Sequence, residues 1–144
     1  MTDFIVDASV VAKWLVDEPD SKQARQLISP EIYLRAPDLL VPEVINTLWK
    51  KHRRGDLTHE RAAAALNLLL QDHIDVTVHL LPARILGKLA LQIATATGRS
   101  AYDCLYLAAA VQAGCRLVTA DGRFVRSIKD PDLSPHIIEL TESR

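Results

Sequence analysis

Four acidic residues stand at positions where an α/β fold could bring their carboxylates together. Each follows a short apolar run of strand-like composition or lies near the start of a predicted helix. These residues are Asp7, Glu43, Asp103 and Asp121. Two carboxylates ~4 Å apart repel by about 4 kcal/mol at an effective dielectric near 20, so a converging cluster would become protonated, spread apart or bind a metal ion. Oxygen ligands without His or Cys favour hard cations such as Mg²⁺ or Mn²⁺, and that metal chemistry points to phosphate esters.

Each of the four acids also has an ordinary structural interpretation. Asp7 and Asp121 could cap the helix or turn that follows them, and Glu43 suits the positive end of a helix dipole. Asp103 stands three residues after Ser100 and could complete a capping box with it. However, the helix-forming stretch around Asp103 contains no other charged residue, so a carboxylate there needs a partner. Both interpretations of Asp103 stay open on this evidence.

Apolar periodicity predicts an alternation of strands and helices along the chain. The predicted strands are 4–6, 32–36, 76–78, 116–119 and 137–138. Four predicted helices have the ranges 9–16, 83–97, 101–113 and 124–128. A further helix is capped by Asp20 and carries Ala24, Leu27 and Ile28 on one face, another has Pro42 in its first turn and stops near Gly55, and another runs from Thr58 to Leu70. This order predicts βαβ units and therefore an α/β fold with a mostly parallel sheet covered on both faces. Ligands in such folds bind at the carboxyl ends of the strands, where strand order reverses.

The predicted helix that begins near Pro42 has two distinct sides. Its apolar side is expected to comprise Val44, Ile45, Leu48 and Trp49. Glu43, Asn46 and Lys50 share a polar stripe on another face, which could border a cleft.

Length and composition favour one globular domain spanning residues 1–144. Hydrophobic residues make up 49% of the chain and charged residues 24%, which excludes a disordered protein. The 17 basic and 18 acidic residues give a formal net charge of −1, so bulk charge does not indicate a nucleic-acid binder. Two cysteines without a metal or redox spacing, and the lack of a long apolar run, predict a cytoplasmic protein that does not enter a membrane.

Four short runs of the sequence together resemble a known family. They are Val6–Ser9, Pro42–Asn46, Tyr102–Ala108 and Thr119–Phe124. In order, spacing and residue type they look like the motifs of PIN-domain ribonucleases, in particular VapC-type toxins, and the match extends over almost the whole chain. The resemblance implies a Rossmann-like parallel sheet flanked by helices, RNA cleavage, and a Mg²⁺ or Mn²⁺ site built from the four acids. Three further residues match accessory polar positions of the family's site, namely Ser9, Asn46 and Thr119.

The resemblance also implies a mechanism and partners. The three aspartates would hold one or two divalent ions, while Glu43 would ligate or orient the water that attacks phosphorus, giving 5′-phosphate and 3′-hydroxyl ends. VapC-type proteins are usually neutralised by a small VapB-like antitoxin and commonly form homodimers. Because the net charge is near zero, the RNA backbone must be met by local basic residues. The candidates are Lys50, Lys51, Arg53, Arg54, Arg99 and Arg123.

Alternative functions remain open at this point. A PIN-like nuclease that processes RNA without being a toxin would use the same chemistry. In a noncatalytic binding module, the four acids would be helix caps alone. A phosphatase of the haloacid dehalogenase type is disfavoured, because Ser9 stands where that family places its second Asp.

Overall fold

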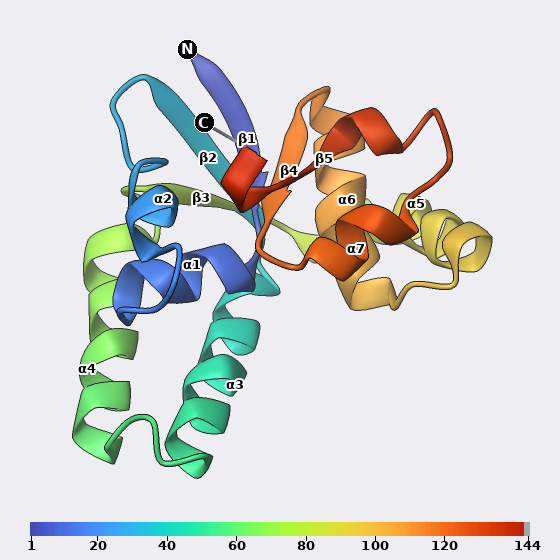
Figure 1. The fold of residues 1–144 in the computed structure, drawn as a ribbon. Helices are drawn as coiled ribbons and strands as arrows, with labels where there is room; N and C mark the ends of the chain where they lie inside the picture. Colours follow the sequence, from blue (N-terminus) through green and yellow to red (C-terminus); the bar gives the residue numbers. More distant parts are fainter. Residues whose placement is uncertain (143–144) are drawn as a thin grey trace.

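The computed structural model describes residues 1–142, which form one sheet with helices on both of its faces (Figure 1). The strands are β1 (Thr2–Val6), β2 (Ile32–Pro37), β3 (Val78–Leu81), β4 (Arg116–Thr119) and β5 (Ile137–Glu139). The helices are α1 (Ala8–Leu15), α2 (Ser21–Arg25), α3 (Leu40–Arg53), α4 (His59–Leu68), α5 (Ala83–Thr97), α6 (Ala101–Ala113) and α7 (Gly122–Ser127). A π-helical turn, Leu69–His73, continues α4, and two 3₁₀ turns, Ser134–His136 and Leu140–Glu142, flank β5.

The sheet is parallel throughout, in the order β3-β2-β1-β4-β5. The chain builds outward from β1 to β2 and β3, then crosses to the other side of β1 for β4 and β5. Strand order therefore reverses between β1 and β4, and in doubly wound sheets this reversal opens a crevice at the carboxyl ends of the strands. The observed fold confirms the predicted α/β class with a parallel sheet.

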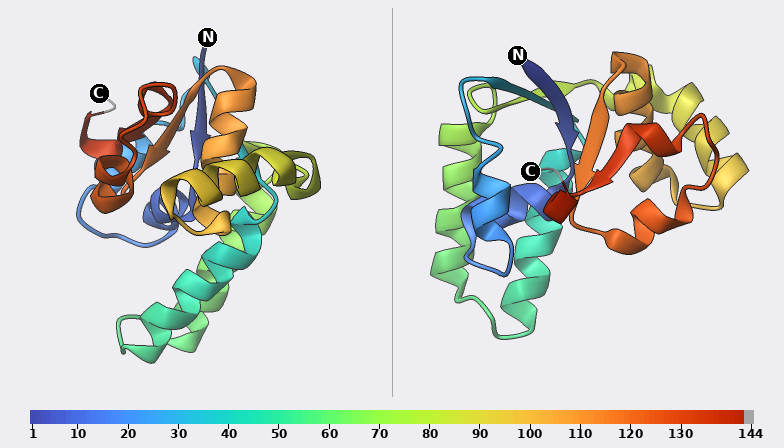
Figure 2. Two further views of the ribbon diagram at one scale, coloured as in Figure 1. Left: turned by 90° about the vertical axis from the view of Figure 1, so that its right-hand side faces the viewer. Right: turned by 45° about the horizontal axis from the view of Figure 1, so that its top comes forward.

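Helices α1 to α4 lie on one side of the sheet, and α5 and α6 lie on the other (Figures 1 and 2). The central strand β1 is covered on both faces, so Ile5 and Val6 are completely buried. Helix α6 packs against β1, β2 and β4, and its residues from Tyr106 to Ala110 are buried. Hydrophobic side chains therefore pack on both faces of the central strand β1.

Several helix boundaries agree with the capping residues in the sequence. Thr58 caps α4 by accepting a hydrogen bond from the Arg61 backbone N–H at 3.2 Å, and Ser100 caps α6 in the same way. Helix α5 has the predicted bounds. Helix α7 begins two residues earlier than predicted, because Asp121 is its capping residue.

Two predictions about local structure were wrong. The third strand begins at Val78, not at residue 76, because residues 73–77 form a tight turn in which His73 Nδ1 and Thr77 Oγ1 lie 2.9 Å apart. This turn leaves Val76 69% exposed. Asp20 precedes α2 in a left-handed conformation, with φ of 70°, and its side chain makes no capping hydrogen bond. Helix α2 ends at Arg25, so Ile28 lies beyond it and is partly exposed.

The predicted apolar side of α3 is only half buried. Val44 and Leu48 are in the core, whereas Ile45 and Trp49 are 44% and 50% exposed. The Trp49 ring instead stacks with the guanidinium of Arg53, at 5.4 Å from the ring centroid. The apolar stripe of α3 is therefore wider than the surface that the core covers.

Among residues 1–142, no helix combines the length and the apolar character needed to cross a membrane.

Candidate active site and metal centre

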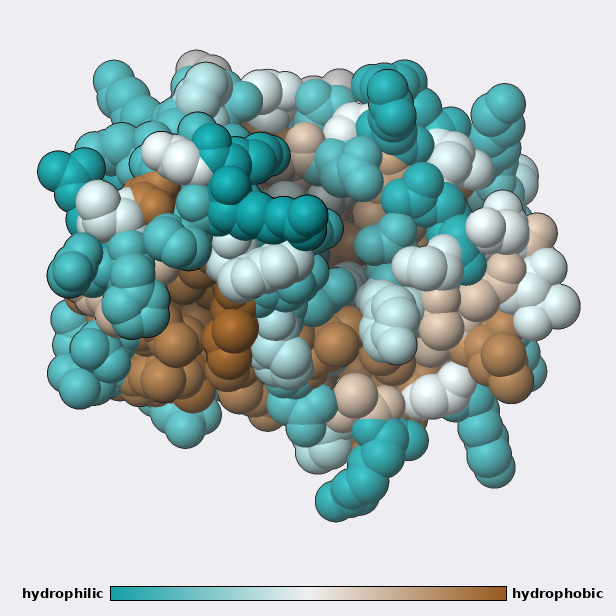
Figure 3. Space-filling model, turned by 90° about the horizontal axis from the view of Figure 1, so that it is seen from below, coloured by the Kyte–Doolittle hydropathy of each residue, from teal (hydrophilic) through white to brown (hydrophobic). Residues whose placement is uncertain are grey.

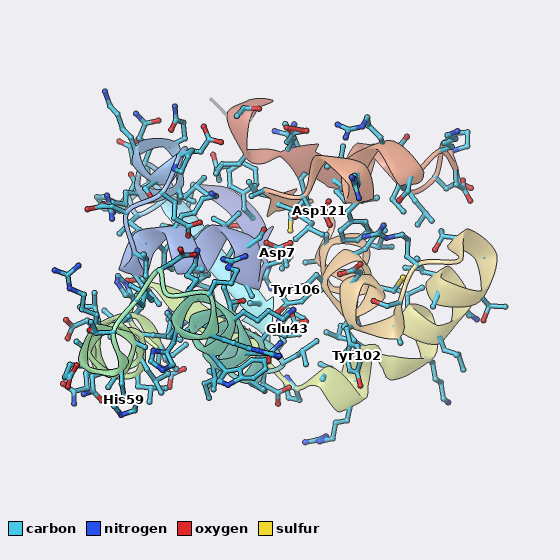
Figure 4. The ribbon with its side chains drawn as sticks, turned by 60° about the horizontal axis from the view of Figure 1, so that its bottom comes forward. Asp7, Glu43, His59, Tyr102, Tyr106 and Asp121 are labelled. Carbon is cyan, nitrogen blue, oxygen red and sulfur yellow. The ribbon has the colours of Figure 1, made fainter. Side chains whose placement is uncertain are left out.

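All four acids line one cavity of about 590 Å³ at the carboxyl ends of β1 and β4. The side chains of Asp7, Glu43 and Asp121 point into a common space between α3 and α6, whereas His59 lies well away on α4 (Figure 4). Seen from below relative to Figure 1, the molecular surface is hollowed near its centre (Figure 3). The polar lining also includes Ser9, Asn46, Thr47, Lys50, Tyr102 and Tyr106. Topology therefore brings carboxylates from four distant segments to the crevice where strand order reverses.

Asp7 is the most buried of the four acids, at 8% exposure, and it is held by hydroxyl and amide donors. Its Oδ1 accepts hydrogen bonds from the Ser9 hydroxyl at 2.5 Å and from the Ser9 and Val10 backbone N–H groups. The Thr119 hydroxyl donates to Oδ2 at 2.5 Å. Asp7 thus caps α1, as its ordinary interpretation predicts, and also lines the cavity.

Burial raises the pKa of Asp7 to about 6, although its hydrogen bonds to Ser9, Thr119 and Val10 oppose the rise. The nearby charge of Glu43 raises this pKa further. Desolvation disfavours the ionised carboxylate, and hydroxyl donors recover only part of the lost hydration. A cation beside Asp7 would supply the missing stabilisation.

Glu43 lies in the first turn of α3 and is paired with α6 across the cavity. The Tyr106 hydroxyl donates to Glu43 Oε1 at 2.7 Å. Partial burial raises the pKa of Glu43, the Tyr106 hydrogen bond lowers it, and the charge of Asp103 raises it. Tyr106 is 2% exposed, and burial together with Glu43 raises the pKa of its hydroxyl, so the hydroxyl remains a proton donor.

Asp103 and Asp121 form the more exposed half of the site, and both contact Arg99. Arg99 Nη2 lies 2.7 Å from Asp103 Oδ2 and 3.5 Å from Asp121 Oδ2. The structure resolves the two interpretations of Asp103, because its carboxylate lines the cavity and binds Arg99 in place of the reciprocal capping-box contact. Asp121 also caps α7 by accepting a hydrogen bond from the Phe124 backbone N–H at 3.1 Å.

The donor set fits a hard divalent cation by its chemistry, because the cavity offers four carboxylates, an amide and hydroxyl groups but no sulfur or imidazole. Within residues 1–142, however, no three His, Cys, Asp or Glu side chains are arranged as metal ligands. Each carboxylate is instead held by a protein donor. A metal ion bound here would either share these carboxylates with their present donors or replace those donors.

Two of the accessory polar residues connect the strand ends. Ser9 Oγ accepts a hydrogen bond from the Ala120 backbone N–H at 3.0 Å and lies 3.4 Å from Thr119 Oγ1. Thr119 Oγ1 also accepts from the Asp121 backbone N–H at 3.1 Å. These bonds hold the loop after β4 against the start of α1. The third residue, Asn46, lines the cavity from α3.

The predicted RNA contacts fall into different environments. Lys50 lines the cavity, whereas Lys51 is 8% exposed and its Nζ lies 2.9 Å from Glu18 Oε2. Arg54 forms an exposed ion pair with Asp56, and Arg53 stacks on a tryptophan ring. Arg123 is exposed on α7, and Arg99 faces the acids. Of the lysine pair, only Lys50 is therefore placed to meet a ligand of the cavity.

Sequence reasoning missed the role of Tyr106 and the pairing of Arg99 with two acids. Tyr106 stands three residues after Asp103, so helical spacing places both on one side of α6. That spacing was a usable signal for Tyr106. The second contact of Arg99, to Asp121, depends on how α6 sits against β4 and has no local signal.

Comparison with known proteins identifies the class to which this parallel sheet and its carboxylate cavity belong. A family model of the PIN domain matches residues 4–128. The chain belongs to the PIN-domain family. It is 38% identical over 117 residues to Ribonuclease VapC3 of Pyrobaculum aerophilum, a match that covers 81% of this chain and 88% of that protein.

Solved structures share the fold at lower identity. PAE2754 from Pyrobaculum aerophilum superimposes with a TM-score of 0.65 at 22% identity, covering 97% of this chain and 92% of that one. VapBC2 from Rickettsia felis, solved with a DNA fragment from its promoter, gives 0.63 at 12% identity, with 96% and 98% covered. VapC20 of Mycobacterium tuberculosis, a toxin that cleaves the sarcin-ricin loop, gives 0.59 at 20% identity, with 87% and 95% covered.

Proposed function

We propose that this chain is an endoribonuclease and the toxin of a VapBC-type toxin-antitoxin pair, and that its whole length forms the PIN domain. The observation that carries the proposal is the single cavity lined by Asp7, Glu43, Asp103 and Asp121. It occurs in a chain that is 38% identical to a VapC ribonuclease. Members of this family generally use a divalent metal, and the all-oxygen donor set favours Mg²⁺ or Mn²⁺ here.

In this proposal the three aspartates would hold the cation, and Glu43 would orient the attacking water and accept its proton. A bound divalent cation supplies Lewis acidity and offsets the charge of the scissile phosphate. Glu43 has a raised pKa and a fixed orientation from Tyr106, which suits a group that accepts and releases a proton. Ser9 and Thr119 hold Asp7 in place through its two oxygens.

The mouth of the cavity offers groups suited to a single RNA strand. Lys50 lines one wall from α3. Tyr102 lines another wall from α6, with 62% of its surface exposed (Figure 4). A lysine can meet a backbone phosphate, and an exposed aromatic ring can stack on a base. We assign these two roles to Lys50 and Tyr102.

The proposed partner is a VapB-like antitoxin, because structural neighbours include toxin-antitoxin complexes such as VapBC2 of Rickettsia felis and a complex from Klebsiella pneumoniae. We further propose a homodimer and a cytoplasmic location, as is common among VapC-type proteins. Growth arrest on expression, relieved by coexpression of the antitoxin, would distinguish a toxin from an RNA-processing nuclease.

The direct test is cleavage of total RNA by the purified chain with Mg²⁺ or Mn²⁺, followed by sequencing of the new ends. We expect 5′-phosphate and 3′-hydroxyl ends, and loss of cleavage with a chelator or in Asp7→Asn. Asp132→Asn, the same substitution at an exposed position outside the cavity, should retain cleavage. Chelator-resistant cleavage by a folded Asp7→Asn protein would refute the proposed site.

A further inference from the structure

Arg99 places a positive charge between two of the four carboxylates of the site. Its Nη2 contacts Asp103 Oδ2 at 2.7 Å and lies 3.5 Å from Asp121 Oδ2. One guanidinium nitrogen therefore bridges acids from α6 and from the loop after β4. A cation that binds both carboxylates through these oxygens must use positions next to that nitrogen.

The guanidinium is held in this position by more than its ion pairs. It stacks over the ring of Phe124, with Cζ 4.7 Å from the ring centroid, and Phe124 is 1% exposed. The Arg99 backbone N–H donates to Thr97 Oγ1 at 3.2 Å, which fixes the start of the side chain. The side chain is only 24% exposed, so much of its freedom is already lost in the metal-free protein.

One polar atom of Arg99 is left without a partner. Nε is buried and makes no hydrogen bond among the described residues. A buried donor without an acceptor is unfavourable, so hydrogen bonding alone would not select this conformation. The attraction of the two carboxylates and the stacking on Phe124 hold the guanidinium there despite this penalty.

The other two acids of the site are held differently. Asp7 is bound by Ser9 and Thr119, and Glu43 by Tyr106, so neutral hydroxyl groups supply their side-chain contacts. Lys50 also lines the cavity and lowers the pKa of Glu43 through its charge. Among residues 1–142, Arg99 is the cationic side chain that forms ion pairs with acids of this site, and its partners are Asp103 and Asp121.

We propose that Arg99 is an internal counter-cation that competes with the divalent metal for Asp103 and Asp121. The inference rests on the proposed metal site and adds a regulation of it. With no metal bound, the guanidinium offsets one of the two negative charges in the exposed half of the site, and a metal ion must displace it from these two carboxylates. Arg99 thereby weakens metal binding and keeps the site closed to a cation at low metal concentration.

The test compares Mn²⁺ affinity, measured by calorimetry, in wild type, Arg99→Gln and Arg99→Lys. Removing a unit charge in contact with two ligands should tighten Mn²⁺ binding by about tenfold in Arg99→Gln. Arg99→Lys keeps the charge and should stay near the wild-type affinity. Arg116→Gln is the matched control, because Arg116 also stacks on a phenylalanine ring, Phe4 at 5.7 Å, but lies at the opposite end of β4.

A second measurement needs no substitution. In wild-type protein, saturating Mg²⁺ should shift the side-chain Nε–H resonance of Arg99 in ¹⁵N spectra and leave that of Arg116 unchanged. Unchanged or weaker Mn²⁺ binding in a folded Arg99→Gln protein would overturn the inference, since Arg99 would then orient the ligands. An unshifted Arg99 resonance at saturating Mg²⁺ would overturn it as well. Failure of both wild type and Arg99→Gln to bind Mn²⁺ would refute the proposed metal site together with this inference.

Discussion

The two halves of the acidic site stabilise their carboxylates in opposite ways. Asp7 and Glu43 lie deeper and are bound by the hydroxyl groups of serine, threonine and tyrosine. Asp103 and Asp121 lie nearer the surface and share one guanidinium. Burial raises the pKa values in the first half, whereas the second half contains its own positive charge.

A metal ion would therefore have two different effects within one cavity. In the buried half it would compensate a carboxylate that is unfavourable to ionise. In the exposed half it would replace a cation that is already present. The two halves should therefore respond differently to substitution, to pH and to salt.

The largest effect is expected from removing a ligand in the buried half. Asp7→Asn should reduce RNA cleavage by more than about a hundredfold, because the deepest anionic ligand of the cation is lost. Cleavage rates at saturating Mn²⁺, beside Asp132→Asn, provide the measurement. A loss below tenfold in a folded protein would contradict the role given to Asp7.

The same substitution should stabilise the metal-free protein. The raised pKa of Asp7, about 6, means that its ionised form weakens folding by about 3 kcal/mol at pH 8. Asn keeps the cap of α1 without the charge. Chemical denaturation of metal-free protein at pH 8 should show this gain for Asp7→Asn, whereas Asp121→Asn, in the exposed half, should change stability by no more than about 0.5 kcal/mol.

The gain from Asp7→Asn should depend on pH with a defined sign. An acid with a raised pKa in the folded state binds more protons there than in the unfolded state, so stability falls as pH rises between about 4 and 6. Above pH 6 the full penalty is present, and below about pH 4 it vanishes. A stability gain that is as large at pH 4 as at pH 8 would show that charge burial is not its cause.

Tyr106→Phe tests the link between Glu43 and α6 and should have an intermediate effect. Losing the donor to Glu43 Oε1 should lower kcat by about 10–100-fold while KM changes little, as expected for a positioning residue. Steady-state kinetics with a defined RNA oligonucleotide provide the readout. A change confined to KM would instead place Tyr106 in RNA binding.

The smallest effect is expected at the rim of the cavity. Lys50→Ala should reduce the salt dependence of RNA binding by about one unit of slope and weaken affinity only severalfold. Lys51→Ala should leave that slope unchanged, because Lys51 is buried against Glu18. Binding of the inactive Asp7→Asn protein across a salt series separates these outcomes, and equal slopes for both lysine variants would contradict the assignment.

Much of the fold could be predicted because its signals are local. Thr58 and Ser100 are good capping residues, and both cap the helices predicted from them. The start of β3 could not be predicted, because the β-branched pair Val76 and Thr77 has strand propensity but lies in a turn in which Thr77 contacts His73. Tertiary context overrode composition at that point.

The site was predictable in its members but not in its contacts. The positions of the four acids follow from strand ends and first helical turns, which converge in any sheet of this topology. The donor that binds each acid depends on side chains that meet only after packing. Arg99, just before α6, contacts Asp121, just before α7, only once these two segments lie side by side. The same limit explains Trp49, because sequence periodicity defines an apolar face but not how much of it a neighbour covers.

The hydrogen bond from Thr119 to Asp7 joins residues separated by 112 positions in the chain. A ribosome must therefore synthesise most of the protein before Asp7 can meet its partner, and strands β1 and β4 must pair before the cavity closes. Contacts of such long sequence separation slow the folding of a small domain. During synthesis, Asp7 and Glu43 therefore appear before Asp103 and Asp121. An emerging chain carries the first two acids of the site while the other two carboxylates are still missing.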